Sequence, residues 1–159
     1  MNLADIQRLF AYDAWANTLM FDCIESLAEE QYTRPLGSSY PNIRETLAHI
    51  VGSEWIWDRR LHGESPSAIP GWMNEATVAS LRAKFKEVAD ARADFLASAD
   101  IEQSISYRDL AGNPFTMKLA DALQHVVNHS TYHRGQLTTM IRQVGATPPR
   151  TDLIVFVRL

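Results

Sequence analysis

The sequence has 159 residues, of which 46% are hydrophobic, and a formal net charge of −4. This length and composition predict one globular domain, with a core large enough to fold without disulfides. The negative net charge, with no run of basic residues, gives no electrostatic support to nucleic-acid binding.

The N-terminal segment and the cysteine content indicate the cellular setting. The first 30 residues carry six acidic side chains and no positive stretch followed by an apolar one, so we expect neither a signal peptide nor a membrane span there. Cys23 is the only cysteine, so no intrachain disulfide can form, and a cytoplasmic location is expected. We interpret Cys23 as a small, at least half-buried hydrophobic residue rather than a nucleophile.

Four segments have the apolar spacing of amphipathic helices, and Pro- and Gly-rich loops separate them. Asn2 and Asp5 are start signals for the first helix, and Asn42 with Glu45 forms a variant of the capping box before the second. Four helices of similar length, each with an apolar stripe, predict an all-α four-helix bundle. The predicted helices cover residues 2–27, 42–61, 74–97 and 116–144.

One stretch departs from the helical pattern. Residues 105–110 and 115–118 flank the turn sequence Ala-Gly-Asn-Pro, which predicts a possible short β-hairpin before the last helix.

Polar residues interrupt the apolar stripes of three helices. An unpaired polar group in a core costs roughly 1–3 kcal/mol in protein mutants, so these residues need partners. The simplest expectation is that they face one another around a polar cavity, as side chains on facing helices do in metal-binding bundles. They are Asp13, Asn17, His49, Glu54, His129, His133 and Gln136.

The histidines of the last helix suggest a metal site. His129 and His133 are four residues apart, so they lie on one face about 6 Å from each other and can chelate one ion. His125 extends the series but lies too far along the helix from His133 to share that ion. A His-x3-His pair alone is more often structural, but His49 at the edge of the second helix's stripe offers a third ligand. His62, at the end of that helix, is a weaker candidate.

Two common metal motifs are absent from the chain. Position 130 is Ser rather than Glu, so the His-Glu-x-x-His pattern of metalloproteases is missing. Glu-x-x-His pairs are also missing, which argues against a di-iron carboxylate bundle.

These residues resemble the DinB family, also described as DinB/YfiT-like metalloenzymes, over essentially the whole chain. The resemblance implies a four-helix bundle with a long connection and a three-histidine zinc or nickel site, whose ligands here would be His49, His129 and His133. Some relatives transfer or isomerise substrates with a small thiol such as mycothiol, bacillithiol or glutathione, and many have no known reaction. The matching pieces are FAYDAWAN at residues 10–17, LAHI at 47–50, NHSTYHRGQ at 128–136 and Pro-Pro-x-x-Asp-Leu at 148–153.

The other inward polar residues have two interpretations each. Asp13 and Asn17 either bond to the backbone or to Arg59 or Arg60, or they orient a ligand histidine from behind, a role also open to Gln136. Asp13 could alternatively act as an acid or base.

Glu54 either forms an ion pair with an arginine such as Arg92, which interrupts the stripe of the third helix, or acts as an acid or base. The ion pair is favoured because buried carboxylates usually have partners. Arg134 is expected on the surface or in an ion pair.

A second apolar strip on the first helix lies away from its core face. It contains Tyr12, Trp15, Leu19 and Cys23. Either the C-terminal segment covers it, or it forms the interface of a homodimer, which is the association we expect.

Three functions remain open at this point. The first is a metal-dependent transferase, in which a small thiol on the ion attacks an electrophilic substrate. The second is a hydrolase in which the ion activates water, with Glu54 or Asp13 as general base. The third is a non-catalytic protein that binds a metal or small molecule.

Overall fold

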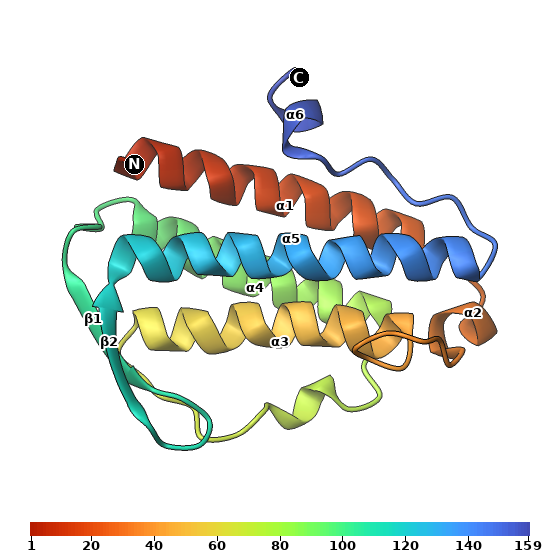
Figure 1. Cartoon of the computed structure of the whole chain (residues 1–159), viewed down its shortest axis with the longest axis horizontal. Coiled ribbons are helices and arrows are strands. Elements are labelled where there is room, and N and C mark those ends of the chain that lie inside the picture. The colour runs from red at the N-terminus through yellow and green to blue at the C-terminus, as the bar shows by residue number, and fades with distance from the viewer.

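The computed structural model describes all 159 residues, and its core is the predicted four-helix bundle (Figure 1). Its long helices are α1 (Leu3–Glu25), α3 (Ile43–Leu61), α4 (Val78–Leu96) and α5 (Leu119–Gln143). Each of α1 and α3 packs against both α4 and α5, so α1 and α3 occupy opposite corners of the bundle. No helix combines the length and the apolarity that crossing a membrane requires.

Side-chain caps fix where the helices begin. Asn2 and Asp5 form a reciprocal capping box at α1, with both side chain–backbone bonds at 2.9 Å. Asn42 caps α3 through the amide of Glu45 at 2.8 Å. These two predicted starts are therefore confirmed.

The third helix begins later than the sequence pattern predicted, at Val78 rather than at residue 74. Glu75 has a φ of 56°, a left-handed conformation that a right-handed helix cannot continue through. Thr77 then caps α4 by accepting a bond from the Ser80 amide at 3.1 Å.

The predicted hairpin is present and takes the first residues assigned to the last helix. Strand β1 (Ser104–Arg108) pairs antiparallel with β2 (Pro114–Lys118), with Ile105 opposite Met117. Helix α5 therefore starts at Leu119 rather than at residue 116, and the loop carbonyls of Gln103 and Ile101 accept bonds from its first two amides.

Three short helices were not predicted: α2 (Glu29–Thr33), the 3-10 helix η1 (Gly71–Met73) and α6 (Leu153–Phe156). The tail that carries α6 returns along α1 (Figure 1). Tyr12 donates to the carbonyl of Thr151 at 2.9 Å, and the Phe156 ring lies 5.6 Å from that of Trp15. The second strip of α1 thus has a cover within its own chain. The homodimer stays a prediction, but the tail covers the apolar surface at Tyr12 and Trp15 that suggested it.

The two largest apolar clusters of the core lie towards opposite ends of the bundle, with buried polar residues between them. One cluster includes Phe21, Leu47, Leu81 and Leu137, and the other, towards the opposite end of each helix, includes Ile6, Leu61, Leu96 and Leu123. The buried polar residues fall between these positions along all four helices. The buried polar residues in this middle layer include Asp13, Asn17, Glu54, Arg92, Ser130, His133 and Arg134.

Candidate metal centre

Three histidines from two helices converge at the α3–α5 contact. His129 and His133 stand one turn apart on α5, and His49 projects from α3. One ring nitrogen from each can be chosen so that all three lie within 4.8 Å of one another. The Nε2 atoms of His49 and His129 are 3.1 Å apart. The wheel positions thus identified three side chains that meet in space and could hold a metal ion.

Hydrogen bonds orient two of these rings. His133 Nδ1 lies 2.8 Å from Gln136 Oε1, which can only accept, so the ring proton is on Nδ1 and Nε2 is free. Gln136 is held in turn by its own bond to Ser39 Oγ at 3.0 Å. His49 Nδ1 lies 2.7 Å from the Tyr40 hydroxyl, whose ring stacks on the imidazole. A His49 that offers Nε2 to an ion would donate its Nδ1 proton to the Tyr40 oxygen.

The local electrostatics keep the imidazoles of His49 and His129 neutral, the form that binds a metal. Burial, with His133 adding to it, lowers the pKa of His49 to about 4. Burial together with the neighbouring histidines lowers the pKa of His129 to about 3. Two imidazole nitrogens at about 2.0–2.1 Å from one tetrahedral ion lie about 3.3 Å apart, close to the His49–His129 separation. The donor set therefore fits a divalent transition metal.

The other two histidines take no part in this cluster. The ring of His125 packs against Trp57, with the ring centres 5.1 Å apart. His62 Nδ1 donates to the carbonyl of Asp58 at 2.8 Å, at the end of α3. Both positions agree with the sequence expectation that neither completes the site.

A cavity of about 400 Å³ opens beside His49. The N-terminal half of α3 forms one wall, and the loop containing η1 forms another. Of the three clustered histidines, His49 alone lines this cavity. The lining includes Tyr40, Arg44, Ala48, His49, Ile69 and Met73.

Asp13 and Asn17 belong to a buried network rather than to the histidine cluster. Asp13 forms an ion pair with Arg134, and both side chains are 2% exposed. Asn17 donates to Asp13 at 3.0 Å and to Ser130 at 3.2 Å. Arg59 and Arg60 are not the partners of Asp13, because Arg134 takes that place. Arg59 pairs with Asp58, and Arg60 lies over the Trp57 and Tyr107 rings.

Both terminal nitrogens of Arg134 are hydrogen-bonded in this network, and its Nε is buried without a partner. It also donates to Ser130 at 2.9 Å and to Thr131 at 2.8 Å, and its guanidinium lies over the Tyr12 ring. Burial favours the neutral form, but the Asp13 carboxylate outweighs it and raises the pKa of Arg134. Of the two placements expected for Arg134, the structure has the ion pair.

Glu54 pairs with Arg92 across the α3–α4 contact, which was the favoured interpretation. Both side chains are almost fully buried. Burial raises the pKa of Glu54, Asp13 adds to that increase, and Arg92 opposes it. Neither Glu54 nor Asp13 bonds to a histidine of the cluster, so the structure gives them no direct place in it.

Sequence reasoning missed two residues that support the histidines, Tyr40 and Ser39. Both lie in the irregular segment before α3, where no periodicity shows which way a side chain points. The one available signal is that Tyr40 precedes the cap residue Asn42, which lies about two helical turns before His49.

Comparison with known proteins agrees with this fold. The model of the DinB family matches residues 1–159. Protein DinB of Bacillus subtilis is 28% identical over 153 residues, covering 91% of this chain and 89% of that protein.

Two solved structures are also similar. A DinB-like protein from Bacillus cereus has a TM-score of 0.69 and 17% identity, covering 91% of this chain and 94% of that one. YfiT from Bacillus subtilis, described as a probable metal-dependent hydrolase with an unusual four-helix bundle topology, has a TM-score of 0.69 and 15% identity, covering 92% and 91%. These similarities show the fold, and the full-length family match shows the lineage: the chain belongs to the DinB family.

Proposed function

We propose that this protein is a metal-dependent enzyme that holds one zinc or nickel ion through His49, His129 and His133. The observation that carries the proposal is the convergence of three imidazoles whose donor nitrogens lie within 4.8 Å. Gln136 and Tyr40 support it, because they bond to the far nitrogens of His133 and His49 and so turn the near ones towards a common point. Second partners of this kind typically accompany histidine ligands.

The reaction that fits best is transfer of a small thiol to an electrophilic substrate. A bound divalent ion lowers the pKa of a coordinated thiol and so supplies a nucleophile at neutral pH. Three neutral histidines leave the charge of the ion uncompensated and leave positions for such a ligand. The cavity beside His49 offers the second substrate a place within reach.

The chain's own residues favour an external nucleophile. Cys23 is half-buried, and burial raises the pKa of its thiol. Its Sγ faces the carbonyl of Thr147 at 3.5 Å, in the segment that follows α5. Asp13 and Glu54 each form an ion pair with a buried arginine. The histidine site therefore needs its nucleophile from a cosubstrate.

A hydrolase is the second candidate, and the description of YfiT favours it. The same ion would activate water in place of a thiol. Asp13 and Glu54 fit the general-base role poorly, because both already neutralise buried arginines.

The deciding experiment compares turnover with and without thiol. Protein loaded with zinc or nickel is given a chlorinated aromatic substrate with glutathione, bacillithiol or mycothiol in turn, and a panel of esters and amides without thiol. The proposal expects thiol-dependent turnover that His129→Ala abolishes and the matched variant His125→Ala retains. Ester or amide cleavage without thiol identifies the hydrolase instead. Equal rates in metal-loaded and metal-stripped protein contradict both.

A further inference from the structure

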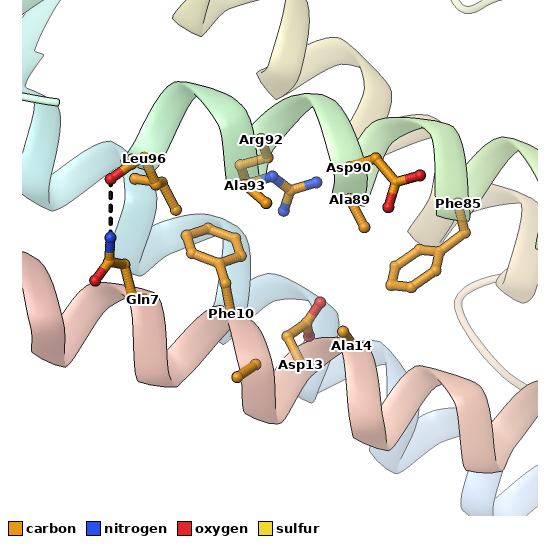
Figure 2. Close-up of a pocket in the computed structure, with 11 residues that line it drawn as sticks. Gln7, Phe10, Asp13, Ala14, Phe85, Ala89, Asp90, Arg92, Ala93 and Leu96 are labelled. Atoms are coloured by element: carbon orange, nitrogen blue, oxygen red, sulfur yellow. Dashed lines mark hydrogen bonds between the residues drawn. The ribbon is translucent and has the colours of Figure 1, made fainter. Parts of the chain in front are cut away.

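A second cavity of about 400 Å³ lies between α1 and α4, away from the histidines on α3 and α5. Its walls are mostly apolar, and Figure 2 shows side chains of both helices facing each other across it. A volume of this size, apolar walls and a few polar groups are typical of small-molecule sites. The apolar lining includes Phe10, Ala14, Phe85, Ala89 and Leu96.

Arg92 brings a buried, incompletely bonded charge to this cavity. Its residue is only 3% exposed, and Nη1 faces the Glu54 carboxylate. Its Nε and Nη2 atoms are buried and have no hydrogen-bond partner, and the two carboxylate oxygens of Glu54 have none either. Figure 2 shows the guanidinium between the two helices beside Phe10, and the Arg92 Cζ lies 4.5 Å from the centre of that ring.

The free atoms form one edge of the guanidinium. Nε and Nη2 donate in parallel, in the planar fork that matches the two oxygens of a carboxylate. Leaving such donors buried without an acceptor costs free energy, and a ligand that supplies the acceptor recovers it.

The two acidic residues that line the cavity, Asp13 and Asp90, are already paired with cations. Asp13 accepts from Arg134 and Asn17, so its charge is already matched. Asp90 stands at the rim, exposed and paired with Lys86 at 2.6 Å. Glu54 lies against Nη1 of Arg92, and burial raises the pKa of its carboxyl.

We propose that the α1–α4 cavity binds a small carboxylic acid with an apolar chain, whose carboxylate bonds to the Nε–Nη2 edge of Arg92 while the chain packs along Phe10, Phe85 and Leu96. This site is separate from the histidine cluster. The carboxylic acid bound there would be distinct from the substrates of the proposed metal reaction.

Calorimetric titration of the full chain with decanoate tests the proposal, with decanol as the probe that lacks the carboxylate. Saturable binding of one decanoate per chain is expected, with decanol at least tenfold weaker. Ala89→Phe fills the cavity and should weaken decanoate binding at least tenfold. Ala83→Phe is the matched control, because Ala83 is exposed on α4 and does not line the cavity.

The arginine is tested without removing its charge. Arg92→Lys keeps a cation for Glu54 but loses the fork, so decanoate binding should again fall about tenfold. Absence of saturable decanoate binding to the unmodified protein, equal affinity for decanol, or full affinity in Ala89→Phe would each overturn the proposal. None of these readouts depends on the metal, so the outcome is independent of the proposed reaction.

Discussion

Replacing Asp13 by Asn tests whether the buried polar layer is structural or belongs to the metal centre. The substitution keeps the shape of the side chain and removes the charge that faces Arg134, which is 1% exposed. Breaking a buried ion pair by removing one partner costs about 3–5 kcal/mol. Arg134 keeps its bonds to Ser130 and Thr131, so we expect the lower end, about 3 kcal/mol.

That loss is large against a total stability of about 5–15 kcal/mol. For a domain of this length it corresponds to a Tm lower by about 6–12 °C. Urea denaturation of the metal-free protein, followed by circular dichroism, gives the free energy of unfolding. Asp90→Asn is the matched control, because Asp90 forms an exposed pair with Lys86 and should cost less than about 1 kcal/mol.

Metal content separates the two roles of Asp13. The folded Asp13→Asn protein should bind its ion with the stoichiometry of the unmodified chain, since Asp13 bonds to no histidine of the cluster. A loss of stability below about 1 kcal/mol would refute the reasoning about the buried pair. Loss of metal at full stability would place the Asp13 carboxylate in the metal centre.

Three further predictions concern the candidate site. Gln136→Ala removes the acceptor of His133 Nδ1 and should weaken metal binding about 10–100-fold in a competition assay with a chelator, and unchanged affinity would contradict the orienting role. Cys23→Ser should leave thiol-dependent turnover nearly unchanged, because the nucleophile is external; loss of turnover would indicate a protein nucleophile. The metal-free protein should lose stability as the pH falls below 6.5, because His49 and His129 bind protons near pH 6.5 when unfolded but only near pH 4 and 3 when folded. The unfolded state thus takes up more protons in this range. For these partly exposed rings we expect the free energy of unfolding to fall by about 1 kcal/mol per pH unit. Urea denaturation of His49→Gln should show a smaller dependence on pH. A dependence equal to that of the unmodified protein would contradict the assignment.

The sequence allowed the bundle and the histidine trio to be predicted because both depend on helical periodicity. A repeat of 3.6 residues identifies the inward face of each long helix, and it placed His129 and His133 one turn apart on the face that meets α3. The same reasoning could not choose the partner of Asp13. A helical wheel gives the direction of a side chain but not the helix that stands opposite, so Arg134, 121 residues away, was not identified.

The sequence pattern misplaced the starts of two helices and missed one loop contact, each for a local reason. Residues 116–118 are compatible with both helix and strand as a short run, and pairing with β1 decides for the strand. The start of α4 depends on the left-handed conformation of Glu75, which the sequence pattern does not show. Tyr40 reaches His49 from an irregular segment, and only the three-dimensional path of that segment brings them together.

The most direct test of the proposed metal centre is elemental analysis of purified protein and single histidine variants after loading with zinc or nickel. We predict one ion per chain in the unmodified protein and in His125→Ala, and loss of stoichiometric metal in His49→Ala, His129→Ala and His133→Ala, with circular dichroism confirming that each variant is folded. Full occupancy in His133→Ala, or loss of the ion in His125→Ala alone, would contradict the assignment of the three ligands.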